Sequence, residues 1–238
     1  MRGEQVERAF AEPEAYLSRR YHLRWRSEAV QAFVGDRRFG RVIDYGCGDG
    51  SLSIPLLDQI DELVLFDTSP AMLAAAKAQL PPDQASKVTL ADGTAMGWRE
   101  RGPADLVLCV GVLGHVEDPL GILADVASLV RPGGAAILEL TDVQHPVGRA
   151  QIIYSRLRQR LQRDRYAWNA LKATEVLSFC RDLGFDVAAS YRYGLPFDLS
   201  GLLPNELVYR LGLRLFGQVP TNTGSLVSCE RLYYLQRH

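Results

Sequence analysis

The sequence predicts an α/β fold built on a mostly parallel sheet with helices on both faces. Three observations predict it. Short apolar runs alternate with helical patterns along the chain, as in repeated strand–helix units. One predicted strand, with the β-branched Val42 and Ile43 and with Asp44 at its end, leads directly into Gly46, Gly48 and Gly50. Another ends at Asp67, which places an acid at the strand end where open α/β sheets bind their ligands.

Composition narrows the class of protein further. The 238 residues suffice for one large α/β domain, so we expect a single domain over 1–238. A net charge of −1 argues against a disordered chain and against a dominant nucleic-acid surface. No apolar run approaches the ~20 residues that cross a bilayer. The four cysteines are isolated and the first residues lack a signal-peptide core, so we expect a cytoplasmic protein.

The glycine-rich stretch predicts a ligand-binding turn. Glycines permit a sharp turn and close approach of a ligand, and a helix that starts at Ser51 would present unpaired N–H groups. No lysine follows, which excludes a phosphate loop. The dinucleotide fingerprint needs its third glycine one residue later, where Ser51 stands. A tight structural turn is the alternative interpretation of the glycines alone.

Two more strand ends carry acids. Asp67 follows Asp44 by 23 residues, close to the ~20-residue spacing of ribose-binding acids. Its carboxylate can accept hydrogen bonds from both ribose hydroxyls. Ser69 begins the next helix. Asp92 and Gly93 follow a short third strand at 88–90, although an Asp-Gly pair is also a common turn.

Together these motifs resemble those of the class I S-adenosylmethionine (SAM) methyltransferases, in particular the ubiquinone-pathway and other small-molecule O-methyltransferases. The motifs are R-V-I-D-Y-G-C-G-D-G at 41–50, D-T-S-P-A-M-L at 67–73, the strand at 104–110 with the following G-V-L-G-H-V, and L-V-R-P-G-G at 129–134. The resemblance implies a Rossmann-like sheet of seven strands with an antiparallel last strand. It also implies SAM as the cofactor and methyl transfer as the reaction.

The resemblance carries a set of cofactor-binding residues. Arg26 lies eighteen residues before Asp44 and best fits the arginine that binds the cofactor carboxylate, with Arg24 as its competitor. Met72 would pack against the adenine, or would be an ordinary core residue. The full set that the resemblance implies is Arg26, Asp44, Gly46, Gly48, Asp67, Ser69, Met72, Asp92, Gly93 and Val110.

Catalytic residues are harder to infer, because transfer from a sulfonium needs a base only when the acceptor must lose a proton. His115 and His145 follow predicted strands and are the candidate bases. The alternative is a capping or packing role for His115 and a surface-loop position for His145. No metal site is expected, since Asp142 and His145 have no third ligand near them in sequence.

The flanking segments suggest how the site is covered. We expect residues 1–39 to form a helical lid, or simply to pack on the domain, and residues 192–222 to form an insertion over the substrate site. An arginine-rich helix at 149–165 is either a solvated face or an anion-binding one.

The sequence therefore predicts a SAM-dependent methyltransferase that acts on a small biosynthetic molecule, at an oxygen. The expected partner is that acceptor, with no membrane or nucleic acid, in a monomer or homodimer. The alternatives are an RNA or protein methyltransferase, or a SAM-binding protein without transfer activity.

Overall fold

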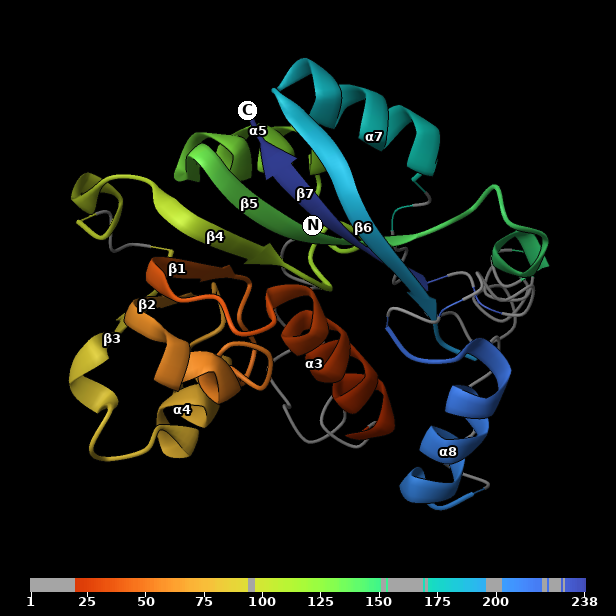
Figure 1. Ribbon diagram of the computed structural model, residues 1–238, viewed down its shortest axis with the longest axis horizontal. Coiled ribbons are helices and arrows are strands. Elements are labelled where there is room, and N and C mark those ends of the chain that lie inside the picture. Colours follow the sequence, from red (N-terminus) through yellow and green to blue (C-terminus); the bar gives the residue numbers. More distant parts are fainter. Residues whose placement is uncertain are drawn as a thin grey trace.

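One sheet organises the molecule. The computed structural model describes residues 20–93, 97–150, 153, 169, 171–195, 203–219, 222, 228 and 230–238. Within these residues seven strands pair in the order β3-β2-β1-β4-β5-β7-β6 (Figure 1). The strands are β1 Phe39–Tyr45, β2 Ile60–Phe66, β3 Val88–Ala91, β4 Ala104–Cys109, β5 Val130–Thr141, β6 Phe185–Tyr193 and β7 Glu230–Arg237. Strands β1 to β5 pair in parallel, whereas β7 runs antiparallel to β5 and β6, which confirms the expected class.

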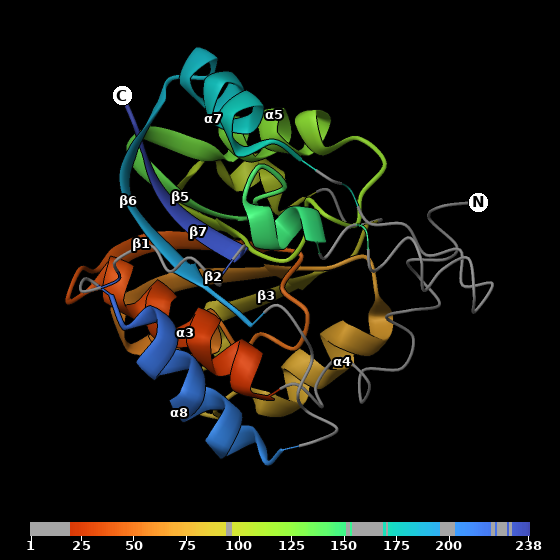
Figure 2. The ribbon, with the colours of Figure 1, turned by 90° about the vertical axis from the view of Figure 1, so that its right-hand side faces the viewer.

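Helices cover both faces of this sheet. The α-helices are α3 Arg20–Val34, α4 Pro70–Gln79, α5 Pro119–Leu129, α7 Ala173–Asp182 and α8 Asn205–Phe216. Short 3-10 helices are η1 Ile54–Gln59, η2 Ala85–Lys87 and η3 Arg99–Arg101. Figure 2 shows α5 and α7 on one side of the sheet and α3, α4 and α8 on the other.

The burial of the central strands explains this layering. In β4, Leu106 and Leu108 belong to the core under α3 and α4, while Val107 and Cys109 belong to the core under α5 and α7. A strand that is buried on both faces has no polar side, so residues 106–109 of β4 form a continuous apolar run. The order of the strands reverses at β1, which lies between β2 and β4. The carboxyl ends of β1 and β4 therefore form the crevice where such sheets bind ligands.

The segment after the glycines is not the α-helix that we expected from Ser51. Gly50 O accepts hydrogen bonds from both Ser53 N and Ile54 N, at 3.2 and 2.9 Å, and the 3-10 helix η1 follows. Pro55 lacks the N–H that an α-helix would need inside this run, and β2 already begins at Ile60. The short, tight connection still buries the apolar side chains of Leu56 and Leu57.

The expected helical segment 1–39 extends too far toward its C-terminal end, compared with the helix in the structure. Helix α3 ends at Val34, and Phe39 already belongs to β1. Residues 1–19 lie outside the described residues. Trp25 and Val30 of α3 are fully buried in the core, on the same face as Val42 and Leu108. The described part of the segment is thus a layer helix of the fold, and its role as a lid stays a prediction.

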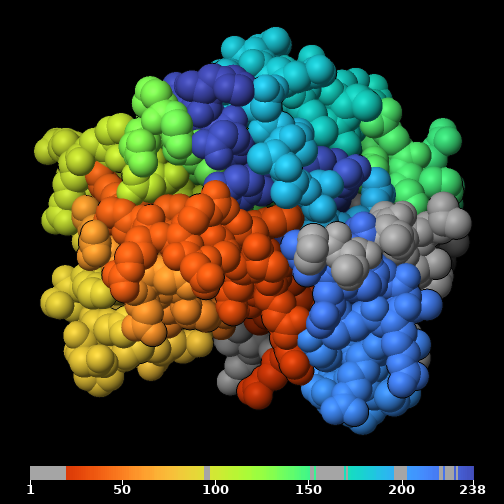
Figure 3. All heavy atoms as spheres, in the orientation of Figure 1, coloured from red at the N-terminus to blue at the C-terminus, as the bar shows by residue number. Residues whose placement is uncertain are grey.

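The expected insertion 192–222 also begins too early, because Arg192 and Tyr193 complete β6. Its helix α8 lies beside α3, as the space-filling view also shows (Figure 3). Trp25 Nε1 donates to Tyr209 O at 3.4 Å, and Tyr209 OH donates to Glu28 at 2.5 Å. Residues 196–202 and 220–221 lie outside the described residues, as does most of the arginine-rich stretch 149–165.

A search of the described residues for a bilayer-spanning helix found none of sufficient length and hydropathy.

Candidate functional site

The glycine turn is tied to the end of β2. Gly46 N and Cys47 N both donate to Phe66 O, at 2.8 and 2.9 Å. Gly46, Gly48 and Gly50 all have positive φ angles, of 77°, 55° and 76°. Such angles are sterically costly for any residue with a Cβ, which explains why glycine is repeated here.

The three glycines differ in the atoms that an added Cβ would meet. A Cβ on Gly46 would collide with the side chain of Val112, and one on Gly50 with that of Ile54. A Cβ on Gly48 would meet nothing within 4 Å. The close neighbours of Gly46 and Gly50 are therefore protein side chains, and Gly48 is the position of the turn that leaves space for a ligand.

This difference gives a prediction with its own control. Gly46→Ala and Gly48→Ala both place alanine at a positive φ, so both should lose stability from backbone strain. Only Gly46→Ala adds overpacking against Val112, which should cost about 1–3 kcal/mol more. Urea denaturation of the two variants measures the difference. Equal free energies of unfolding would show that Val112 moves aside without cost.

Asp67 joins the turn to the helix that follows β2. Its Oδ2 accepts from Gly48 N at 2.9 Å, and its Oδ1 accepts from Ser69 N at 2.8 Å. Burial raises the pKa of the Asp67 carboxyl, and the backbone N–H groups of Ser69 and Gly48 oppose that rise. The carboxylate thus lies beside the open glycine, at the carboxyl end of β2.

Asp44 supports the turn from beneath. Its side chain is buried, and its Oδ2 accepts from Ser53 Oγ at 2.6 Å. Burial raises its pKa to about 7, and the nearby Asp67 and Asp49 add to that effect. In this structure Asp44 holds the glycine turn onto the following segment.

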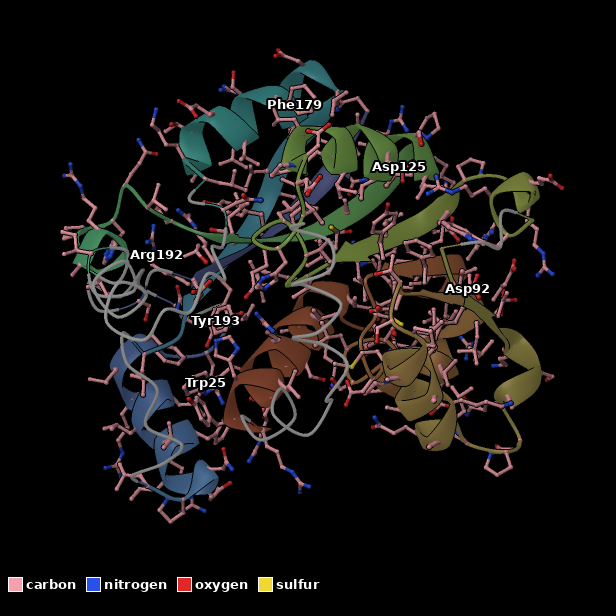
Figure 4. All side chains as sticks on the ribbon, turned by 180° about the vertical axis from the view of Figure 1, so that it is seen from behind. Trp25, Asp92, Asp125, Phe179, Arg192 and Tyr193 are labelled. Carbon is pink, nitrogen blue, oxygen red and sulfur yellow. The ribbon has the colours of Figure 1, made fainter. Side chains whose placement is uncertain are left out.

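The remaining predicted residues on this side lie at the ends of β2 and β3. Asp67 N donates to Ala91 O at 3.1 Å, which brings Asp92 and Gly93 next to the β2 end. Ser69 is the N-cap of α4, where its side chain accepts from Met72 N at 3.4 Å. The Met72 side chain is fully buried. Figure 4 shows Asp92 at the β3 side of the molecule, away from Tyr193 and Arg192.

Arg26 makes the predicted grip, but on a carboxylate of the protein itself. Its Nε and Nη2 donate to the two oxygens of Glu139, at 3.0 and 2.6 Å. Its Nε also lies 2.8 Å from the hydroxyl of Tyr193. The competitor Arg24 is half-exposed and pairs with Glu28 and Glu206. Arg26 is thus the arginine that faces the strand ends. It lies beside Gly111, the residue that follows Val110 in the chain.

Three residues of this edge were not predicted from the sequence: Glu139, Tyr193 and Glu230. Glu230 accepts from Thr141 Oγ1 at 2.8 Å and pairs in register with both Thr141 and Tyr193. Burial, and then the negative charge of Glu139, raise the pKa of Glu230 to about 7. A signal existed for Glu139, because it is a charged residue inside the apolar run of a strand that should be buried.

The two candidate histidines have different surroundings. Burial, with a contribution from the Arg26 charge, lowers the pKa of His115 to about 4, so this histidine is neutral at pH 7. His145 Nδ1 accepts from Val147 N at 3.3 Å, at the start of the helical residues 146–150. Burial also lowers the pKa of His145. The contact of His145 is that of a helix cap, and a role as a base stays a prediction for both residues.

Among the described residues, no three His, Cys, Asp or Glu side chains converge in a way that could hold a metal ion. The carboxylate of Asp142 instead accepts from Gln144 N at 3.0 Å and pairs with Arg192 Nη2 at 3.1 Å.

Comparison with known proteins decides the family. A sequence model described as "Methyltransferase domain" matches residues 16–189, which include the glycine turn, Asp67, Asp92 and Arg26. This chain belongs to the methyltransferase-domain family. The match confirms the resemblance that the ordered motifs predicted.

Relatives within the family include ubiquinone biosynthesis O-methyltransferases. That of Aliivibrio fischeri (strain MJ11) is 33% identical over 99 residues, which cover 40% of this chain and 42% of the relative. This match thus spans less than half of that relative. The enzyme of Leptothrix cholodnii is 26% identical over 211 residues, which cover 85% of this chain and 82% of the relative.

Solved structures share the methyltransferase-domain fold. A SAM-dependent methyltransferase from Thermotoga maritima, described as a possible histamine N-methyltransferase, has a TM-score of 0.66 at 17% identity and covers all of both chains. Magnesium protoporphyrin IX methyltransferase from Synechocystis PCC 6803, crystallised with S-adenosylhomocysteine (SAH), has a TM-score of 0.59 at 19% identity, over 92% of this chain and 84% of that one. At these identities the likeness concerns the fold alone.

Proposed function

We propose that this chain is a SAM-dependent methyltransferase that methylates an oxygen of a small biosynthetic molecule. The observation that carries the proposal is the position of Asp67 beside the open Gly48, at the crevice of a methyltransferase-domain sheet. The ubiquinone biosynthesis O-methyltransferases among its relatives support oxygen as the acceptor atom.

The residues around Gly48 fit a nucleoside. Space is open above Gly48, and Asp67 can accept hydrogen bonds from ribose hydroxyls beside it. A Cβ on Gly93 would meet only Thr68, at 3.8 Å, so the backbone after Asp92 is also accessible. We infer that Asp67 holds the ribose and that Asp92 and Gly93 face the base.

When bound, SAM supplies a methyl group that its sulfonium already makes electrophilic. The protein then needs to position the acceptor oxygen in line and exclude water. His115, which is neutral at pH 7, is the candidate to accept a proton from an acceptor hydroxyl, although burial lowers its pKa to about 4 and so makes it a weak base. We infer that the acceptor binds near His115, at the carboxyl ends of β4 and β5.

Binding of SAH tests the proposal before any acceptor is known. We expect isothermal titration calorimetry to show one SAH per chain, and ATP, which lacks the sulfur and the amino-acid part, to bind far more weakly. Absence of SAH binding would contradict the proposal.

The acceptor class is then tested with methyl-labelled SAM and a panel of phenols, amines and RNA. We expect methylation of phenols. Methylation confined to amines would contradict oxygen as the acceptor atom, and methylation confined to RNA would contradict a small-molecule acceptor.

A further inference from the structure

Arg26, at the carboxyl edge of the sheet, has the geometry of a carboxylate-binding residue but already pairs with a carboxylate of the protein. A guanidinium that offers Nε and Nη2 side by side is the geometry that binds a carboxylate with two parallel hydrogen bonds. Here Glu139 of β5 already takes both donors, at 3.0 and 2.6 Å. The pair is nearly buried, with 10% of the Arg26 side chain and 4% of that of Glu139 exposed.

The surroundings of Glu139 contain more acid than base. Tyr193 OH of β6 donates to Glu139, and His115 and Cys109 near the end of β4 are uncharged at pH 7. Glu230, at the start of β7, adds a second carboxylate that interacts with Glu139 and Arg26. Other charged or titratable groups near the cluster are His22 of α3, beside Gly194, and the Asp142–Arg192 ion pair. In the described part of the chain, Arg26 is the arginine that interacts with both glutamates.

We propose that the cofactor's carboxylate competes with Glu139 for Arg26, and that the exchange is accompanied by uptake of a proton by the Glu139–Glu230 pair. This inference rests on the proposed function, since it concerns the amino-acid part of SAM or SAH. Arg26 would then have two carboxylate partners in turn: Glu139, with which it pairs in this structure, and the cofactor, to which the family resemblance assigns it.

The proton follows from the charge that is left on Glu139. A carboxylate that loses its cation in a buried site is strongly destabilised, unless it gains a proton or another cation. The α-ammonium group of SAH is such a cation, but pairing with it takes no proton from the buffer, so calorimetry separates the two cases. After the exchange, Arg26 faces the ligand, and Glu139 and Glu230 remain together with Tyr193 OH and Thr141 Oγ1 as donors. Two like charges at one site favour protonation of one of them.

The titration of Glu230 sets the pH at which this should be visible. Its pKa is already raised to about 7 while Arg26 is nearby. At pH 8 Glu230 is therefore mostly ionised before binding, and loss of the Arg26 charge, a charge that lowers the pKa of Glu230, raises that pKa further, so a proton is taken up. At pH 6 much of that proton is already present. Binding that takes up one proton weakens with rising pH, by about tenfold per pH unit at most.

The experiment compares SAH with 5′-methylthioadenosine, which has the same nucleoside and sulfur but no carboxylate. Calorimetry at pH 8 in phosphate and in Tris measures proton uptake, because the two buffers have different ionisation enthalpies. We expect uptake approaching one proton for SAH and none for methylthioadenosine. SAH affinity should also fall from pH 6 to pH 8 by about three- to tenfold more than that of methylthioadenosine.

Glu139→Gln tests the competition directly. The introduced amide keeps an oxygen for Tyr193 but lacks the charge that holds Arg26, so SAH affinity at pH 8 should rise by about tenfold and proton uptake should fall. Methylthioadenosine affinity should not change. Glu139→Asp keeps the charge and should restore most of the proton uptake, which separates charge from folding. Glu28→Gln, on the same helix as Arg26 but paired with Arg24, is the matched control and should change neither quantity.

Two results would overturn the inference: SAH that binds without proton uptake at pH 8, or Glu139→Gln with an unchanged ratio of SAH to methylthioadenosine affinity. Arg26 would then be a structural partner of Glu139 only. If neither nucleoside binds to the wild-type chain, the proposed function itself fails, and the inference fails with it.

Discussion

Asp67→Asn is expected to weaken SAH binding by about 10- to 100-fold, because ribose hydroxyls lose a charged acceptor worth about 1.5–3 kcal/mol. The carboxylate accepts from Gly48 N and Ser69 N on its two oxygens, so an amide must turn its NH₂ group toward one of these N–H donors. The substitution therefore weakens both the ribose contact and the organisation of the turn. Calorimetry with SAH measures the loss.

The control for Asp67 lies on the same strand. Asp61 is exposed at the amino end of β2, at the edge opposite the crevice, so Asp61→Asn should leave SAH affinity unchanged. Methylthioadenosine, which keeps the ribose, should lose as much affinity for Asp67→Asn as SAH does. Equal affinities of the wild-type chain and Asp67→Asn would remove Asp67 from the binding site.

Trp25→Ala is expected to lower the free energy of unfolding by about 3–5 kcal/mol, the usual cost of removing a buried aromatic side chain. Only 1% of Trp25 is exposed, and its ring contacts Tyr21 and Phe216 edge-on, with centroids 5.1 and 4.9 Å apart. Its Nε1 also donates to Tyr209 O of α8. The substitution leaves a cavity between α3, α8 and β6 that these rings fill poorly.

Urea denaturation followed by circular dichroism measures this loss. Leu207→Ala is the matched control, since Leu207 lies on α8 but is 51% exposed, and it should cost less than about 0.5 kcal/mol. A loss below about 1 kcal/mol for Trp25→Ala would mean that α8 collapses into the space without strain.

The parts of the fold that the sequence predicted are those that depend on local pattern. The apolar run that ends at Asp67 identified β2 as a strand buried on both faces, and Asp67 and Asp92 lie at strand ends as the alternation of strands and helices required. The prediction of an α-helix after Gly50 was wrong, because the spacing of the apolar residues there suits both an α-helix and a 3-10 helix. The few residues before β2, and Pro55 among them, decide in favour of a 3-10 helix.

The acidic side of the site depends on distant pairs instead. Arg26 and Glu139 are 113 residues apart, and Arg26 and Tyr193 are 167 apart. Nothing local to Arg26 indicates which carboxylate will face it, since that follows from the position of α3 across β5 and β6. The family resemblance therefore singled out Arg26 as the arginine for a carboxylate, but nothing in the sequence indicated Glu139 as its partner in the protein.

The close approach of α8 to α3 has a mechanical consequence. Gly212 has no side chain, and a Cβ at that position would overlap the ring of Trp25, so the indole lies directly against the backbone of α8. Trp25 also precedes Arg26 in the chain. A rotation of α3 that moved the Arg26 guanidinium toward a ligand would also move the Trp25 indole. Because the indole contacts the backbone of α8, that helix would have to move together with α3.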